Sequence, residues 1–326
     1  MARRHPKGEL STLATFILTT NDKEIFMNIV GLFDGISCGQ LALERAGIEV
    51  NQYFSSEIDK YAMFITNKNF KDTIQMGDVK NLSYKNGMLG NGVNAWKTEI
   101  DLLIGGSPCQ DLSQYKTSVY ERTGLMGERS GLFFEYVRLL NEIKPKYFLL
   151  ENVVMSKDDQ DKITEILGVE PILINSNLVC AAERKRLYWT NIPNITQPQD
   201  KGITLKDIVL NPDNVEDKFW YKDVPFTYNG DDKKVQATLE KKLQRSMKEV
   251  YNLNGKCNTL KCDGDGGDRQ IKVFQNGMPR KLTPIEYERL QNLPDNYTGG
   301  ISNSRRYTAI GNGWTVDVIA HILKHI

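Results

Sequence analysis

This chain is poor in the residues from which disulfide frameworks and zinc sites are built. It has five cysteines, an odd number that is scattered along the chain, which favours a reducing compartment over a disulfide scaffold. Cys257 and Cys262 lie close together but lack a second pair of ligands, and the three histidines are His5, His321 and His325. We therefore expect no metal site.

The chain also lacks an excess of charge and a long apolar run. Its 42 Lys and Arg balance 41 Asp and Glu, which excludes a generally basic protein but leaves room for a local basic groove. No stretch reaches the roughly 18 apolar residues that a membrane helix needs, so we expect no membrane partner. Residues 1–26 resemble a signal peptide only faintly and are predicted to form a flexible N-terminal extension.

The remaining length allows one large domain with an insertion, or two domains. We expect an α/β unit over residues 27–194, because apolar runs alternate there with helical patterns. Residues 195–300 carry many Asn, Asp and Lys with little periodicity, which predicts a second, small and irregular domain. A helix predicted at 314–323, within the segment 301–326, is expected to return to the first unit.

The first unit begins with a strand, a glycine turn and a helix. The apolar run at 28–33 predicts a buried strand, residues 34–39 form the turn, and Gly47 ends the helix that follows. Such a unit brings backbone N–H groups against a nucleotide-like ligand, although the fingerprint G-x-G-x-x-G is absent. A nicotinamide oxidoreductase is therefore disfavoured.

Two acidic residues follow the next apolar segments. Glu57 ends the run at 52–56, where an acid typically binds ribose hydroxyls, but it equally suits the first turn of a helix. Asp78, in Gly77-Asp78-Val79, is a candidate acceptor for an adenine amino group.

Cys109 is the candidate nucleophile. The apolar run at 102–104 breaks at Gly105-Gly106-Ser107-Pro108, which puts the thiol on the loop leaving a strand. A lone cysteine is more often a small buried side chain, so its neighbours matter. Helical spacing at 132–143 and a strand at 147–150 are followed by Glu151, which we expect at the same edge of the sheet.

Several segments, in order, resemble the DNA cytosine-5 methyltransferases. Asp34 and the segment 179–184 resemble the vertebrate de novo enzymes, whereas the leucine-containing segment after Arg280 resembles bacterial or phage members. The six segments that carry the resemblance are Phe33-Asp34-Gly35-Ile36-Ser37-Cys38-Gly39, Gly105-Gly106-Ser107-Pro108-Cys109-Gln110, Glu151-Asn152-Val153, Arg184-Lys185-Arg186, Arg280-Lys281-Leu282-Thr283-Pro284 with its continuation to Pro294, and Gly311-Asn312-Gly313-Trp314-Thr315-Val316.

The resemblance implies a Rossmann-like α/β fold, with a mostly parallel sheet and helices on both faces, plus a small target-recognition domain. It implies methyl transfer from S-adenosyl-L-methionine to C5 of a flipped-out cytosine in duplex DNA, with S-adenosyl-L-homocysteine as product. Cys109 would add to C6, and Glu151 would hold or protonate N3. One of Arg184 and Arg186 would contact the cytosine O2, and the other would support a loop or a phosphate.

The resemblance also assigns a cofactor site. Ribose would bind to Glu57, adenine to Asp78 and Val79, and the methionine end would be closed by Asn312, Trp314 and Val316. The remaining expected cofactor residues are Phe33, Asp34, Gly35, Ile36, Ser37, Cys38, Ile58 and Pro108.

DNA contacts are expected from two polar loops. The loop from Gln110 to Arg129 is interpreted as a lid, in which Gln114 or Tyr115 fills the vacated stack. In the small domain, Lys and Arg residues beside a glycine–aspartate loop would bind phosphates. The expected DNA-binding residues are Gln110, Ser113, Gln114, Tyr115, Lys256, Lys261 and Arg269.

Further expectations concern partners and alternatives. We expect a cytoplasmic monomer of bacterial or phage origin, with a dimer left open and a cognate restriction endonuclease as a candidate partner. A tRNA cytosine methyltransferase of the same fold and a catalytically silent DNA-binding relative remain alternatives.

Overall fold

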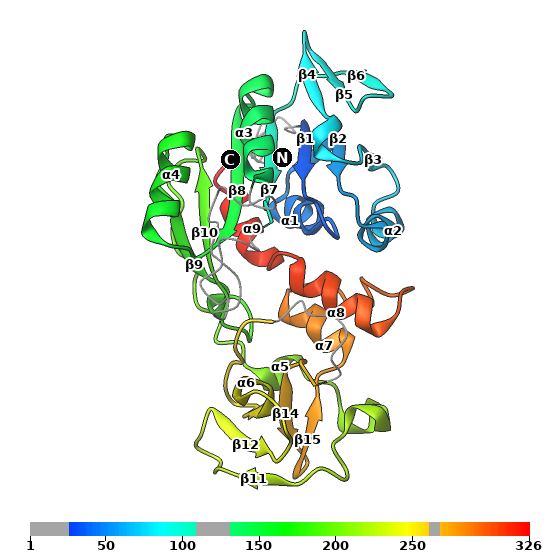
Figure 1. Ribbon diagram of the computed structural model, residues 1–326, viewed down its shortest axis with the longest axis vertical. Coiled ribbons are helices and arrows are strands. Elements are labelled where there is room, and N and C mark those ends of the chain that lie inside the picture. Colours follow the sequence, from blue (N-terminus) through cyan, green and yellow to red (C-terminus); the bar gives the residue numbers. More distant parts are fainter. Residues whose placement is uncertain (1–25, 109–130, 261–267) are drawn as a thin grey trace, which may run out of the picture.

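The computed structural model describes residues 26–108, 131–260 and 268–326. Its centre is a seven-stranded sheet in the order β3-β2-β1-β7-β8-β10-β9, in which β10 runs antiparallel to both of its neighbours (Figure 1). The predicted mostly parallel α/β fold is therefore confirmed. The strands of this sheet are β1 (Phe26–Leu32), β2 (Glu49–Ser56), β3 (Ile74–Gln75), β7 (Leu102–Gly105), β8 (Tyr147–Val153), β9 (Ile172–Asn175) and β10 (Lys185–Thr190).

Helices cover both faces of this sheet because its strands are apolar on both sides. Ile29 of β1 packs into the core on one face, whereas Val30 and Leu32 pack into the core on the other. The first core contains residues of α1 (Cys38–Ala46), α2 (Lys60–Asn69) and α9 (Val316–Leu323). The second contains residues of α3 (Leu132–Ile143) and α4 (Lys157–Leu167).

Most elements of the first unit lie where the sequence pattern put them. The helix predicted at 132–143 is α3, and Gly47 ends α1 with a φ of 75°. Two details differ. Glu151 lies within β8 rather than after it, and α9 begins at Val316 rather than at Trp314, because Thr315 adopts an extended backbone.

A three-stranded antiparallel sheet between β3 and β7 was not predicted. It consists of β4 (Ser83–Lys85), β5 (Met88–Gly90) and β6 (Ala95–Lys97). Asn86 and Gly87 form the first turn with φ values of 53° and 74°, which is a favoured hairpin connection. The strands are too short and too polar to show an alternating pattern.

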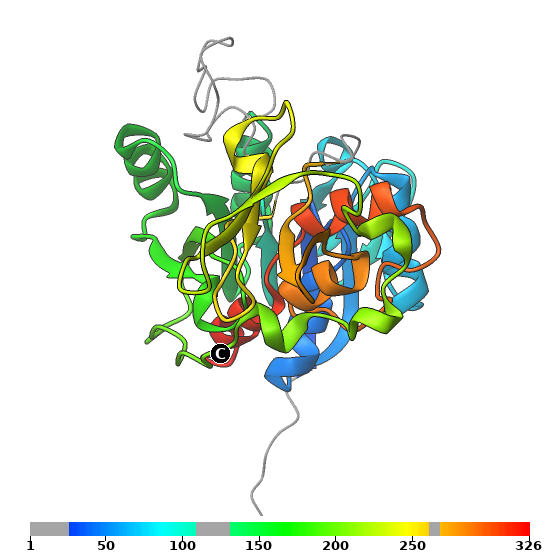
Figure 2. The ribbon, with the colours of Figure 1, turned by 90° about the horizontal axis from the view of Figure 1, so that it is seen from below.

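The second unit is more regular than its sequence pattern indicates. It contains a five-stranded sheet in the order β11-β12-β13-β14-β15 (Figure 2). Strands of three to five residues give no sustained periodicity, which is why the pattern looked irregular. The elements are α5 (Leu205–Ile208), β11 (Phe226–Tyr228), β12 (Val235–Leu239), α6 (Arg245–Lys248), β13 (Glu249–Tyr251), β14 (Lys272–Gln275) and β15 (Met278–Lys281).

Several contacts join the units. Residues 181–183 and 257–259 are held by backbone hydrogen bonds of 3.0 Å from Cys257 N–H to Ala181 and 2.8 Å from Glu183 N–H to Cys257. Helices α7 (Pro284–Leu290) and α8 (Asn303–Asn312) lie between the sheets in Figure 1, and the Tyr297 hydroxyl donates to the Ile36 carbonyl at 2.7 Å. The predicted domain limits at 194 and 300 stay predictions.

Among the described residues, no helix has both the length and the apolar character needed to cross a membrane.

Candidate active site

The turn after β1 is shaped by the buried carboxylate of Asp34. It accepts hydrogen bonds from the hydroxyls of Tyr53 at 2.6 Å, Ser55 at 2.7 Å and Ser37. Burial raises the pKa of Asp34 in spite of these donors. A Cβ on Gly31 would lie 2.4 Å from the Tyr53 hydroxyl, so only glycine fits there. The carboxylate of Asp34 thus faces the protein and braces the turn.

Glu57 and Ile58 follow β2 beside this turn. One oxygen of Glu57 accepts the Gly35 N–H at 2.8 Å, and the other accepts the N–H groups of Ile58 and Asp59 at 2.8 Å. Ile58 is 73% exposed, which is unusual for so large an apolar side chain. Beside it, a Cβ on Gly35 would meet no atom within 4 Å. An acid, an apolar side chain and open space together fit a nucleoside.

The segment after β3 completes this row along the carboxyl ends of the strands. Asp78 accepts the Lys80 N–H at 3.0 Å and so caps a short helical turn, and Val79 is 4% exposed. Ser56 fixes the preceding backbone by donating to the Gly77 carbonyl at 2.8 Å. The residues expected to hold ribose and adenine therefore follow consecutive strands of one sheet edge.

Glu151 lies in β8 between two donors. Arg186 Nε contacts its Oε1 at 2.9 Å, and the Trp314 indole N–H contacts its Oε2 at 3.1 Å. The Glu151 side chain is 10% exposed and that of Arg186 is 14% exposed. The pair thus combines a carboxylate and a guanidinium that are both largely shielded from water.

The two arginines of the R-x-R pair have different partners. Arg184 donates to the carbonyls of Gly311 at 3.3 Å and Gly313 at 3.2 Å, whereas Arg186 contacts Glu151. Arg184 therefore supports the loop that carries Asn312 and Trp314. Val316 is fully buried at the start of α9, and Asn312 is exposed at the end of α8.

Asn152 is a positioning residue that the sequence reasoning missed. Its side-chain amide donates to the Ser107 hydroxyl at 3.1 Å, and both residues are buried. It thereby fixes the segment that ends at Pro108, directly before Cys109. Asn152 follows Glu151 in a motif that the sequence shows, and this position could have indicated its role. Cys109, Gln110, Ser113, Gln114, Tyr115 and Lys261 lie outside the described residues.

The described cysteines are poor nucleophiles. Cys38, Cys180 and Cys257 are buried. Burial raises the pKa of Cys38 to about 12 and also raises the pKa values of Cys180 and Cys257. Because the thiolate is the reactive form, these three thiols are inert at neutral pH. The part of the chain that the structure describes also contains no cluster of His, Cys, Asp and Glu suited to a metal.

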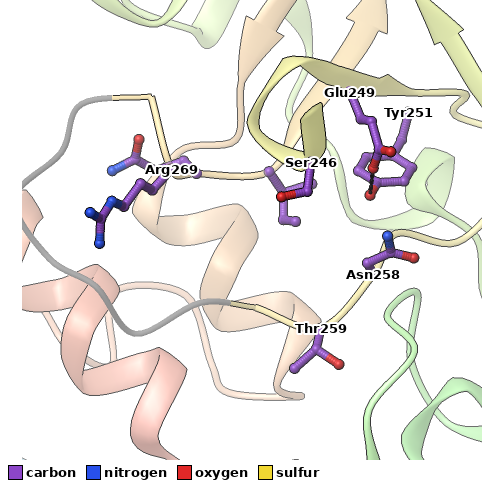
Figure 3. A pocket seen from close by; sticks show the side chains of 8 residues that line it. Ser246, Glu249, Tyr251, Asn258, Thr259 and Arg269 are labelled. Carbon is purple, nitrogen blue, oxygen red and sulfur yellow. Dashed lines mark hydrogen bonds between the residues drawn. The ribbon is translucent and has the colours of Figure 1, made fainter. Parts of the chain in front are cut away.

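A small polar pocket lies in the second unit (Figure 3). Arg269 lies on the opposite side of it from Glu249 and Tyr251. Asn258 and Thr259 also line the pocket, and the Thr259 hydroxyl donates to the Glu183 carbonyl at 2.6 Å. The pocket therefore adjoins the segment that leads into Arg184.

Lys256 has protein partners. Its ammonium contacts the carbonyl of Asn177, that of Cys180 at 3.4 Å, and Asp200 at 3.7 Å. Two exposed basic residues that precede the pocket residue Ser246 in the sequence, Lys242 and Arg245, were not singled out from the sequence. They lie in a short run rich in Lys and Arg, and such a charge pattern could have identified them as candidate DNA contacts.

The Asp268 carboxylate is bound by three side chains of the second unit. It accepts from the Tyr221 hydroxyl at 2.6 Å and from Lys241 at 2.8 Å, and Lys281 lies 3.6 Å away. Burial opposes its charge, but these hydrogen bonds and the two lysines outweigh burial and lower the pKa of Asp268 to about 2.

We expect Asp268→Asn to lower the free energy of unfolding by about 1 kcal/mol at pH 7, a small value because the cluster is partly solvated. Because the pKa of Asp268 is lower in the folded state, its carboxylate stabilises the fold fully at pH values above the unfolded-state pKa of about 4. This stabilisation is lost as the pH falls toward the folded-state pKa. The difference in the free energy of unfolding between variant and parent should therefore shrink as the pH falls from about 5 to about 2. Urea midpoints at several pH values measure it, and a difference independent of pH would contradict the assignment.

An acid beside a glycine turn, at the carboxyl edge of an open α/β sheet, is the arrangement of nucleotide-binding enzymes. That is the class that the fold and the site define. A model of the C-5 cytosine-specific DNA methylase family matches residues 27–168 and 178–326, and the chain belongs to this family. It is a DNA cytosine-5 methyltransferase whose methyl donor is S-adenosyl-L-methionine, which confirms the predicted family, activity and cofactor.

Relatives match along most of the chain. The type II methyltransferase M1.ScrFI of Lactococcus lactis subsp. cremoris is 28% identical, covering 93% of this chain and 79% of the relative. M.HhaI of Haemophilus parahaemolyticus is 26% identical, covering 95% and 97%. The solved Entamoeba histolytica methyltransferase EhMeth has a TM-score of 0.67 at 18% identity, covering 92% and 97%. S. pombe Dnmt2 has a TM-score of 0.65 at 15% identity, covering 91% and 97%, and these two likenesses show the fold.

Proposed function

We propose that Glu151, Arg186 and Cys109 form the cytosine pocket. The observation that carries this proposal is the placement of the paired Glu151 and Arg186 in adjacent strands, beside the segment that leads to Cys109. Arg186 contacts the cytosine O2, because it already lies beside the carboxylate. Arg184 supports the closing loop through the carbonyls of Gly311 and Gly313.

The reaction follows from these placements. The Cys109 thiolate adds to C6 while N3 takes a proton or hydrogen bond from Glu151, and the C5–C6 electron pair becomes available at C5. The bound cofactor supplies an electrophilic methyl group. C5 takes the methyl group, a base removes the C5 proton, and the thiolate leaves C6 to restore the ring. Glu151 takes up a proton before the cycle, gives it to N3 as the thiolate adds, and regains it as the thiolate leaves.

The cofactor residues are proposed from the sheet edge. Phe33 to Cys38 line one side through the turn that Asp34 braces, and Gly35 leaves the space open. Glu57 binds the ribose hydroxyls, and exposed Ile58 packs on the adenine ring. Asp78 and Val79 bind the adenine edge. Pro108, Asn312, Trp314 and Val316 enclose the methionine end.

Target DNA is proposed to bind across the small sheet. Arg269 is exposed at the pocket of Figure 3 and supplies a phosphate or base-edge contact, together with Lys261. Gln110, Ser113, Gln114 and Tyr115 contact the flipped nucleotide. Lys256 instead joins the two units, since its ammonium is bound by protein oxygens.

The substrate is tested by methyl transfer from labelled cofactor to duplex DNA and to tRNA. We expect label in DNA, and bisulfite sequencing of DNA from an expressing host then gives the methylated sequence. Label in tRNA alone would support the alternative substrate, and label in neither would support a silent relative.

We expect Arg269→Ala to raise KM for DNA several-fold and to reduce the salt dependence of DNA binding by about one unit of log–log slope. Lys157→Ala is the matched control, because Lys157 is an exposed cation on α4, away from the small sheet. Fluorescence anisotropy over a salt series measures the slope. Equal slopes for both variants would contradict the role of Arg269.

We propose a cytoplasmic monomer, with a type II restriction endonuclease as its partner in the host. Relatives named type II methyltransferases support the pairing, whereas the orphan methyltransferase M.SPRI of Bacillus phage SPR, 36% identical over 129 residues, leaves the enzyme without such a partner as the alternative. Light scattering tests the monomer, and cleavage of unmethylated DNA by host extract tests the partner.

A further inference from the structure

Trp314 reaches from the closing loop to the proposed catalytic carboxylate. Its indole N–H contacts Glu151 Oε2 at 3.1 Å, while Arg186 Nε contacts Oε1 at 2.9 Å. Each carboxylate oxygen therefore has its own donor, and the Glu151 side chain is only 10% exposed. A carboxylate with a donor on each oxygen cannot rotate without losing one of these contacts.

The backbone that carries Trp314 is fixed on both sides. The Gly313 carbonyl accepts from Arg184 at 3.2 Å and from Gln291 at 3.1 Å. The Thr315 hydroxyl donates to Gln291 Oε1 at 2.6 Å, and the Val316 N–H donates to the Gln291 carbonyl at 3.1 Å. The indole thus has a rigid base, so its N–H is directed at Glu151 before any substrate binds.

Gly106 makes room for the indole, and Gly39 lies in contact distance of its ring. A Cβ on Gly106 would lie 2.9 Å from Trp314 Nε1 and 3.0 Å from Glu151 Oε2, so a side chain there would push the two apart. A Cβ on Gly39 would lie 3.6 Å from Trp314 Cζ3 and 2.5 Å from Ile104 Cδ1. The ring therefore packs between the start of α1 and the end of β7, where larger residues do not fit.

We propose that Trp314 is a positioning residue for Glu151, in addition to enclosing the cofactor. By holding Oε2, it sets the carboxyl plane that meets cytosine N3, and it does so through preorganisation rather than through contact with the base. This inference rests on the proposed role of Glu151. If Trp314 only enclosed the cofactor, its substitution would weaken cofactor binding. If it only packed against its neighbours, its substitution would lower the stability of the fold.

The test is Trp314→Phe, which keeps an aromatic ring and removes the N–H donor. We expect kcat to fall about 10- to 100-fold, since a hydrogen bond to a charged group is lost, with the Kd of S-adenosyl-L-homocysteine unchanged. Trp189→Phe is the control. Trp189 is fully buried, and its indole N–H donates to the Thr164 hydroxyl at 3.0 Å, away from the site. We expect it to lower the thermal midpoint and leave kcat unchanged when assayed below that midpoint.

A double-mutant cycle with Glu151→Gln, read by single-turnover methylation, completes the test. We expect Trp314→Phe to cost little further rate in the Glu151→Gln background, because it acts through that carboxylate. Additive losses, or a raised cofactor Kd with unchanged kcat, would overturn the inference and leave the proposed function intact. Full activity of Glu151→Gln alone would instead overturn the proposed role of Glu151.

Discussion

Cys109→Ser is expected to lower the rate of DNA methylation by roughly 10³-fold or more, because serine at neutral pH is a far weaker nucleophile than a thiolate. Cofactor binding and the thermal midpoint stay unchanged, since the substitution replaces one small atom. The measurement is transfer of labelled methyl groups under single-turnover conditions. Cys257→Ala is the matched control, because Cys257 is a buried thiol with a raised pKa and should not limit the rate.

Duplex DNA containing 5-fluorocytosine tests directly whether Cys109 forms a covalent bond to the base. Fluorine cannot leave C5 as a proton does, so the parent enzyme should stay covalently bound and migrate more slowly on a denaturing gel. Cys109→Ser should give no such band, and Cys262→Ser should retain it. The reverse pattern would identify Cys262 as the nucleophile and contradict the mechanism.

Glu286→Ala is expected to lower the free energy of unfolding by about 3–5 kcal/mol, because it leaves the buried guanidinium of Arg280 without its carboxylate partner. Arg280 and Glu286 are both fully buried and form two contacts, of 2.9 Å and 2.5 Å. Glu286 also accepts the N–H groups of Thr283 at 2.6 Å and Leu210 at 2.8 Å. Removing the carboxylate therefore leaves four N–H donors without this acceptor in the junction between the two units. Urea unfolding measures the change.

Two comparisons sharpen that test. Asp161→Ala breaks the exposed pair with Lys157 on α4 and should lower the free energy of unfolding far less than Glu286→Ala does, because water screens this pair. The double variant Arg280→Met with Glu286→Leu removes both charges, and should recover part of the loss because no buried charge remains unpaired. Equal costs for Glu286→Ala and Asp161→Ala would show that the buried pair contributes no more than a surface pair.

Local pattern was enough to predict the framework of the large sheet. Helix α3 has the bounds that its apolar spacing predicts, and β1 and β8 lie at the expected runs, because buried elements of seven or more residues leave a strong periodic signal. The β4–β6 meander and the five-stranded sheet were missed, because strands of three to five residues leave little signal.

The site residues were found as motifs, but their contacts were not. The sequence indicates that Arg184 and Arg186 act near the base, yet only the fold shows which of them contacts Glu151. Trp314 lies 163 positions from Glu151, so no local pattern connects them. The partners of Lys256 are likewise set by how two distant segments pack, and a charge count does not reveal them.

The backbone hydrogen bonds between residues 181–183 and 257–259 limit where the second unit can be exchanged with that of a relative. Residues 181–183 belong to the segment that leads into Arg184, and residues 257–259 belong to the segment that lines the pocket of Figure 3. A graft that replaces only residues 226–281 would set foreign residues at 257–259 against native 181–183. Chimaeras should therefore exchange residues 181–183 and 257–259 together, or keep both segments native by placing their junctions inside the small sheet.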